Sequence, residues 1–289
     1  MGNAAARISI TIRRGQKIMK AKKGKKIVLI VAVILVVLTL AQLFILGYKG
    51  GIGPLKFLRN QKMAKLPGNA EQYHLENVEP LADSPLKGKT ICFLGSSVTN
   101  GSASMGVSMA DYIGKRNDCA IIKEAVNGTT LTDKSNLSYV QRLIRKVPQD
   151  TELDILVCQL STNDASRKMP LGSISDSKDR DAFDRATILG SMEYIIAYAQ
   201  ETWDCAVVFY TGTRYESEAY QAMVDSLPAL REKWGICVID LWNDPQMNAV
   251  SEEDYAFYMS DNVHPTQAGY LKWWVPVMER TLYTLVAAQ

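Results

Sequence analysis

Hydrophobic residues gather in one long run near the N-terminus and in five short runs after residue 89. The short runs are about as long as β-strands, and helical spacing of apolar positions fills the stretches between them. The expected strands are 90–95, 120–126, 154–161, 206–212 and 236–242, and the expected helices are 107–116, 137–147, 183–203 and 215–234. A last helix is expected after Pro265, with a kink near Pro276.

Strands that are apolar throughout and alternate with helices indicate a parallel sheet with helices on both faces. The sequence therefore predicts an α/β fold with right-handed crossovers. Ligand sites in such sheets lie at the carboxyl ends of the strands. The residues that follow each short run are thus the first place to look for chemistry.

The long hydrophobic run, Ile27 to Gly47, holds 21 residues without a charge. At about 1.5 Å per residue it is about 30 Å long, the thickness of a bilayer's hydrocarbon core. Nine Lys and Arg precede it and five follow by residue 65, which favours a cytoplasmic N-terminus. The alternative is a cleaved signal peptide, but its apolar region would be about 7–15 residues long with a small-x-small cleavage site. A retained single-pass anchor in the cell membrane is favoured, with the main domain extracellular.

The expected organisation has four parts: a basic cytoplasmic tail (1–26), a transmembrane helix (27–47), a stalk or linker (48–85) and a main folded domain (86–289). The stalk is rich in Gly and Pro and shows little periodicity. His74 lies within it and is expected to be a solvated linker residue.

Charge is divided unevenly along the chain. The first 65 residues hold 14 of the 33 Lys and Arg and no acid, so the remainder carries 19 cationic against 30 acidic residues. A body this acidic argues against nucleic acid as a partner. The five cysteines form no CxxC pair and are interpreted as buried thiols, and with two histidines no zinc site and no cofactor is expected.

Polar motifs stand at three of the expected strand ends and near the C-terminus. They are GSSVTNG (95–101), NGTT (127–130), STND (161–164) and DNVHPT (261–266). Serines between glycines suit a sharp turn that exposes a nucleophile and backbone N–H groups. A glycine at 128 lets the backbone approach a ligand closely, and the amide of Asn163 can donate to a developing oxyanion.

His264 is the one histidine after residue 85, and Asp261 precedes it by three residues. One tight turn can bring the carboxylate to the imidazole, which would fix its tautomer. Each motif also has an ordinary structural interpretation: a Gly/Ser loop, an Asn-Gly turn, an Asx-type helix cap and a surface histidine. Together they supply a nucleophile, three oxyanion donors, a base and its orienting acid.

The four motifs, in this order, resemble the blocks of the SGNH hydrolase superfamily, also called GDSL esterases/lipases, over about residues 88–285. GSSVTNG resembles the first block, GDSxTxG, and aligns Ser97 with the nucleophile; Gly128, Asn163, Asp261 and His264 match the later blocks. The resemblance implies a three-layer α/β/α, flavodoxin-like fold with strand order 2-1-3-4-5. It also implies metal-free ester hydrolysis by a Ser97–His264–Asp261 triad, with an oxyanion hole of Ser97, Gly128 and Asn163.

Two positions depart from the family pattern. Ser96 replaces the aspartate of the first block, and Ser161 replaces the glycine that opens the third. Both changes leave the proposed catalytic groups in place and leave the shape of the pocket, and hence the substrate, open.

The sequence thus predicts a serine esterase that hydrolyses or transfers short-chain O-acyl groups, such as O-acetyl, on extracellular or envelope glycans. The alternatives are a lipid or lysophospholipid esterase and a non-catalytic glycan-binding domain. The segment 165–184 is interpreted as a surface loop or as a lid, and Arg167 and Lys168 could meet an anionic substrate group. Five aromatic residues are interpreted as core or as a sugar-binding wall: Trp242, Tyr255, Tyr258, Trp273 and Trp274.

Overall fold

The computed structural model describes residues 2–48 and 53–288, with the backbone alone for 2–18 and 20–22. The chain divides into two compact units, residues 1–59 and 60–289. Residue 1 of the expected tail, residues 49–52 of the expected stalk and residue 289 lie outside the described residues.

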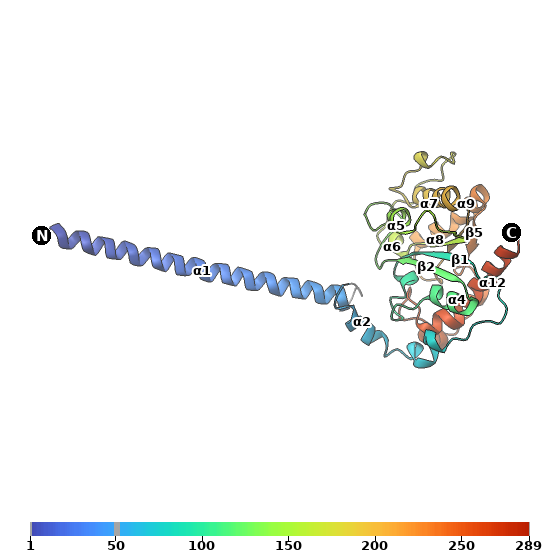
Figure 1. The fold of residues 1–289 in the computed structure, drawn as a ribbon, viewed down its shortest axis with the longest axis horizontal. Coiled ribbons are helices and arrows are strands. Elements are labelled where there is room, and N and C mark those ends of the chain that lie inside the picture. The colour runs from blue at the N-terminus through green and yellow to red at the C-terminus, as the bar shows by residue number, and fades with distance from the viewer. Residues whose placement is uncertain (1, 49–52, 289) are drawn as a thin grey trace. The chain divides into compact units, whose positions relative to one another are not determined.

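The first unit is dominated by one long helix, α1 (Gly2–Tyr48) (Figure 1). Its part Lys23–Tyr48 has 26 residues, a mean hydropathy of 3.1 and no buried residue in its most apolar window. This part is long and apolar enough to cross a membrane, and it contains the segment 27–47 expected from the sequence. The next helix, α2 (Lys56–Met63), spans the boundary between the two units.

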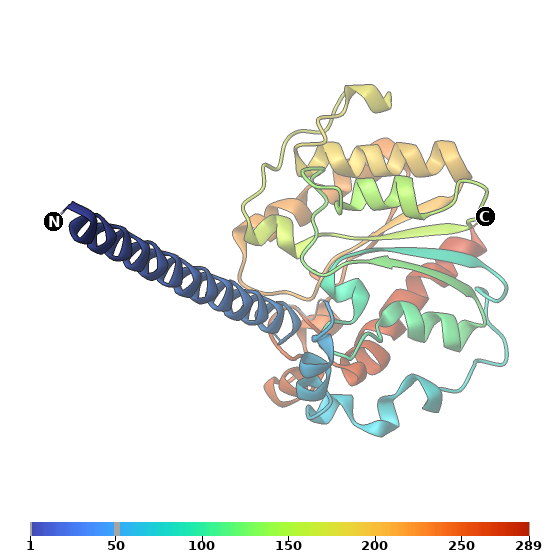
Figure 2. The ribbon, with the colours of Figure 1, turned by 60° about the vertical axis from the view of Figure 1, so that its left-hand side comes forward.

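The second unit is built on a five-stranded parallel sheet with the order β2-β1-β3-β4-β5, which confirms the expected topology (Figure 2). The strands are β1 (Thr90–Gly95), β2 (Ala120–Ala125), β3 (Ile155–Gln159), β4 (Ala206–Tyr210) and β5 (Cys237–Ile239). Three of them, β3, β4 and β5, end two or three residues earlier than expected.

Helices cover both faces of the sheet, which confirms the three-layer arrangement (Figure 2). Alternate β1 residues point to opposite faces: Cys92 and Leu94 belong to one buried cluster, and Ile91 and Phe93 to the other. The first cluster is covered by α5 (Tyr139–Lys146), α7 (Ile188–Trp203), α8 (Glu218–Asp225) and α9 (Leu227–Trp234). The second is covered by α4 (Met109–Asn117) and α12 (Val275–Ala287).

Several helices differ from the expected ranges for identifiable reasons. The single helix expected at 215–234 is two helices, α8 and α9, because Pro228 has no N–H to continue the first helix and sits in the first turn of the second. The helix expected from 183 begins only at Ile188, where the Thr187 hydroxyl caps it by accepting from the Gly190 N–H at 3.2 Å.

The C-terminal helix is irregular ahead of Pro276. Residues of η5 (Gly269–Trp274) take π-helical hydrogen bonding, and α12 starts directly after them. The missing N–H of Pro276 accounts for a break at this point. The remaining short helices are α3 (Ser97–Asn100), α6 (Thr162–Ser166), α10 (Pro245–Asn248), α11 (Glu252–Tyr258), η1 (Pro67–Asn69), η2 (Glu71–Tyr73), η3 (Leu75–Asn77) and η4 (Arg180–Ala182).

Residues 60–85, which the sequence assigns to a stalk, lie within the second compact unit. The Asn69 side chain, 2% exposed, donates to the carbonyl of Ala103 at 2.8 Å and accepts from the backbone N–H of Gln267 at 2.7 Å. His74 is half-buried, and its Nε2 lies 3.3 Å from the Asn69 carbonyl. This segment packs through short turns, buried hydrogen bonds and a few scattered apolar side chains, Met63, Tyr73 and Val78, so it shows no regular hydrophobic periodicity.

Replacing Asn69 with alanine should therefore lower the free energy of unfolding by about 1–3 kcal/mol, because it leaves buried backbone groups without partners. Denaturant unfolding of the detergent-solubilised chain, followed by near-ultraviolet circular dichroism, measures this. Asn77→Ala is the matched control, since Asn77 is exposed in the same segment and should cost less than about 0.5 kcal/mol. If the two variants were equally stable, the buried hydrogen bonds of Asn69 would not stabilise the domain as inferred.

Candidate active site

The turn between β1 and α3 places Ser97. A Cβ on Gly95 would overlap the Thr99 side chain, so only glycine allows the chain to fold back this tightly. The Gln159 Oε1 atom at the end of β3 accepts from the Ser96 N–H at 2.8 Å and from the Thr99 hydroxyl at 2.9 Å. The turn is thereby fastened to the neighbouring strand, and Ser97 is 9% exposed at its apex.

His264 connects Ser97 with Asp261. Its Nδ1 atom lies 2.9 Å from both carboxylate oxygens of Asp261, and its Nε2 atom lies 2.8 Å from Ser97 Oγ. Since a carboxylate only accepts, Nδ1 carries the proton, and Nε2 is left to accept from the Ser97 hydroxyl. The residues predicted from two ends of the domain therefore form one continuous hydrogen-bonded chain.

The pKa of Asp261 is set by opposing effects. Partial burial opposes ionisation, but the hydrogen bond from His264, the charge of that imidazole and the backbone N–H groups of Val263 and His264 outweigh it and lower the pKa to about 2. The carboxylate is therefore ionised across the neutral range. It can stabilise a positive charge on the imidazole when Nε2 takes up a proton.

Gly128 and Asn163 lie together beside the end of β2. The Asn163 Nδ2 donates to the Thr129 carbonyl at 2.9 Å, which uses one of its two N–H groups and leaves the other. Gly128 has a φ of +76°, and its carbonyl accepts from Arg167 Nη2 at 2.7 Å. Arg167 thus contacts this turn, whereas the sequence suggested that it could meet an anionic group of the substrate.

A buried arginine joins these two parts of the site. Arg142 on α5 is 2% exposed and donates to the carbonyl of Gly95 at 2.7 Å, to the carbonyl of Glu124 at 2.7 Å and to the Thr129 hydroxyl at 3.1 Å. The guanidinium therefore holds the end of β1, the end of β2 and the Gly128 turn in one arrangement.

Sequence reasoning missed both Arg142 and Gln159. A polar Gln inside the apolar run 154–161 was a signal that could have pointed to Gln159, since buried amides in strands need specific partners. Asp164 was also missed: it is fully buried and accepts from the N–H groups of Leu131 at 2.7 Å and Thr132 at 3.1 Å.

Four of the five aromatic residues singled out in the sequence divide into two sets, and the fifth, Tyr258, stacks on Trp273 with ring centroids 5.6 Å apart. Trp242 and Trp274 are buried in the core, at 2% and 0% exposure. Tyr255 and Trp273 line a cavity of about 340 Å³. Among the residues that the structure describes, no three His, Cys, Asp or Glu side chains gather as a metal site would require.

The loop 165–184 is tied to the helices beside it. The Ser175 N–H donates to Glu193 of α7 at 2.8 Å, and Lys233 of α9 donates to the Ser177 carbonyl at 2.6 Å. Phe183 is buried against Trp234. These contacts agree with a packed surface loop.

The chain belongs to the GDSL-like lipase/acylhydrolase family, whose model matches residues 93–272. This is a family of esterase- and lipase-like hydrolases, as the resemblance predicted. No curated protein sequence matches the chain.

Solved structures share the fold at low sequence identity. A protein from Lactobacillus plantarum is 20% identical with a TM-score of 0.55, covering 70% of this chain and 98% of its own. A protein from Desulfitobacterium hafniense, described as lipolytic and of the G-D-S-L family, is 14% identical with a TM-score of 0.52, covering 67% and 99%. One from Bacteroides ovatus, described as a GDSL-like lipase, is 16% identical with a TM-score of 0.51, covering 70% and 100%.

The positive φ of Gly128 yields a direct test of the turn. Gly128→Ala should lower the free energy of unfolding by about 1–2 kcal/mol, because a Cβ disfavours the left-handed conformation. The cost is conformational, since the nearest atom to an added Cβ, Arg167 Nη2, lies 3.8 Å away. Gly128→Asn is the control and should cost less, because asparagine tolerates this region. Denaturant unfolding measures both, and an alanine variant as stable as the parent chain would refute the assignment.

Proposed function

We propose that this protein is a serine esterase in which Ser97 is the nucleophile, His264 the general base and Asp261 its orienting acid. The observation that carries the proposal is the hydrogen-bonded chain from Ser97 Oγ through His264 to Asp261, at 2.8 and 2.9 Å. Those distances lie within the range in which an imidazole can take a proton from a hydroxyl.

The reaction proceeds in two halves. Ser97 Oγ attacks the ester carbonyl carbon as His264 Nε2 takes its proton, and Asp261 stabilises the imidazolium. The carbon–oxygen bond to the alcohol then breaks, and His264 gives its proton to the departing alcohol. Water next attacks the acyl-enzyme, its proton passes to His264, and Ser97 leaves with that proton as the carboxylic acid is released. A sugar hydroxyl in place of water would make the same cycle an acyl transfer.

The tetrahedral intermediates need donors for their oxyanion. We assign this role to the backbone N–H groups of Ser97 and Gly128 and to the free N–H of the Asn163 amide. The Ser97 N–H is the first of α3, so the helix itself offers it no acceptor. The Asn163 amide is hydrogen-bonded to the Thr129 carbonyl in the Gly128 turn. The Asn163 amide and the Gly128 N–H are therefore held close together before substrate binds.

For the substrate we propose short-chain O-acyl esters of extracellular or envelope glycans. The apolar segment 27–47 with its basic N-terminal flank supports a single-pass anchor that keeps the N-terminus in the cytoplasm and the hydrolase domain outside. Tyr255, Trp273 and polar neighbours around the 340 Å³ cavity give a surface of the kind that a sugar ring requires.

Ser97→Ala should lower the turnover of p-nitrophenyl acetate by about 10⁶-fold, because the triad acts as a unit. It should also abolish covalent labelling by a fluorophosphonate. Ser96→Ala is the matched control: it removes the adjacent hydroxyl, whose bond to Gln159 is long at 3.3 Å, and should keep turnover within about tenfold and retain labelling. Near-normal turnover in Ser97→Ala would reject the nucleophile, and labelling lost only in Ser96→Ala would move it to Ser96.

The acid side of the pH–rate profile should follow the uptake of a single proton. Activity falls on acidification because a protonated His264 cannot accept from Ser97. Asp261, with its pKa lowered to about 2, stays ionised as this happens and adds no second step above pH 3. Measuring kcat/KM between about pH 4 and pH 8 checks this, and a two-proton limb or a flat profile would speak against the assigned roles.

A further inference from the structure

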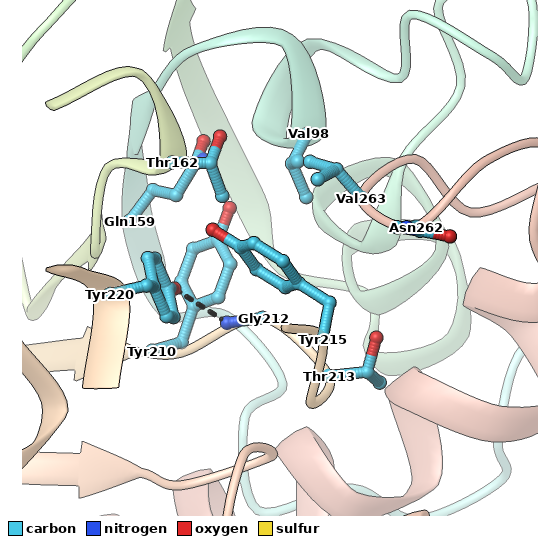
Figure 3. A pocket seen from close by; sticks show the side chains of 10 residues that line it. All are labelled: Val98, Gln159, Thr162, Tyr210, Gly212, Thr213, Tyr215, Tyr220, Asn262 and Val263. Carbon is cyan, nitrogen blue, oxygen red and sulfur yellow. Dashed lines mark hydrogen bonds between the residues drawn. The ribbon is translucent and has the colours of Figure 1, made fainter. Parts of the chain in front are cut away.

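A very small cavity lies beside the proposed catalytic groups. Three of its lining residues are the immediate chain neighbours of site residues: Val98 follows Ser97, Thr162 precedes Asn163, and Val263 precedes His264 (Figure 3). Its volume is about 10 Å³, close to the minimum that holds one water-sized group. A methyl group is of that size.

The tyrosines on one side of this cavity, opposite Val98 and Val263, form a fixed wall (Figure 3). The Tyr210 hydroxyl is hydrogen-bonded to Thr99 at 2.6 Å. The Tyr220 hydroxyl accepts from the Gly212 N–H at 2.8 Å and donates to the Leu160 carbonyl at 3.1 Å. Both of these side chains are fully buried, so neither can move aside without breaking buried hydrogen bonds.

Tyr215 also belongs to this wall, but unlike Tyr210 and Tyr220 it is only partly buried. It lies in the loop between β4 and α8, is half-buried, and rests on Tyr220 and Trp242 with ring centroids 5.4 and 5.3 Å apart. The rings behind it are core residues, so the Tyr215 ring cannot retreat into the domain. Of the three tyrosines in the wall, Tyr215 is therefore the one that can be replaced while the two fully buried rings, Tyr210 and Tyr220, stay in place.

A second, larger cavity adjoins the first, since Thr213 lines both. It has a volume of about 340 Å³ and is lined by Arg214, Tyr255 and Trp273 among others. An ester has two ends, and a glycan or lipid alcohol cannot enter a 10 Å³ cavity. The larger cavity suits the alcohol, which leaves the small one for the acyl group.

We propose that the small cavity receives the acyl group of the ester and that Tyr215 restricts that group to acetyl. This inference rests on the proposed esterase function and adds the acyl class and the residue that sets it. An acetyl group places one methyl in the cavity. Each further carbon of a longer acyl chain would meet the Tyr215 ring.

The test compares p-nitrophenyl acetate, butyrate and hexanoate as substrates of the detergent-solubilised full chain. In the unmodified protein, kcat/KM should be about 10- to 200-fold lower for butyrate than for acetate. Tyr215→Ala should lower the ratio of kcat/KM for acetate to kcat/KM for butyrate at least about tenfold, since it removes the ring that a longer acyl chain meets. Tyr215→Phe is the matched control, because it keeps the ring and should keep the original ratio.

Val98→Ala enlarges the same cavity from the opposite wall and provides the test if Tyr215→Ala does not fold. It should also lower the ratio of kcat/KM for acetate to kcat/KM for butyrate. The outcomes separate the two proposals. A chain that is not labelled by a fluorophosphonate and turns over none of the three esters would overturn the esterase function itself. A chain that is labelled but hydrolyses hexanoate as fast as acetate, or whose enlarged-cavity variants keep the original acyl preference, would overturn the acetyl restriction alone.

Discussion

The structure depends on a buried set of hydrogen bonds that joins the carboxyl ends of three parallel strands. Gln159 at the end of β3 holds the Ser96–Thr99 turn after β1, and Arg142 holds the carbonyls of Gly95 and Glu124 together. Such bonds are strong inside a protein, and an unpaired member would be costly. The backbone around Ser97 is therefore fixed, before any substrate binds, by groups outside the Ser97–His264–Asp261 chain.

The fold could be predicted because its strands are short and mostly apolar and its helices are longer with helical spacing of apolar positions, so period and length identify most elements. The errors have local causes. Pro228 divides a helical pattern that the apolar positions alone continue through. Residues 60–85 pack by a side-chain amide, Asn69, by short turns and by three scattered apolar side chains, and this packing produces no hydrophobic periodicity in the sequence.

The proposed site could be predicted in part for a related reason. Ser97, His264 and their partners stand in short motifs at strand ends, and the order of parallel strands brings such ends to one edge. Arg142 could not be found this way: in the sequence it is one of several cations on an expected helix, and its role depends on acceptors 13 to 47 residues away. Residues that act through distant backbone groups need the structure to reveal them.

If the protein acts as proposed, the groups that break the ester bond and the residue that limits the acyl group belong to different parts of the fold. The groups assigned to bond-breaking follow β1, β2 and β3 or precede η5, and Arg142 and Gln159 fasten the first three. Tyr215, which would limit the acyl group, lies in the loop after β4, and neither Arg142 nor Gln159 is hydrogen-bonded to that loop in the described part of the chain. Loops of this kind tolerate change better than buried strand ends. Substitution at Tyr215 can therefore alter which ester is accepted while the hydrogen bonds that hold Ser97 stay intact.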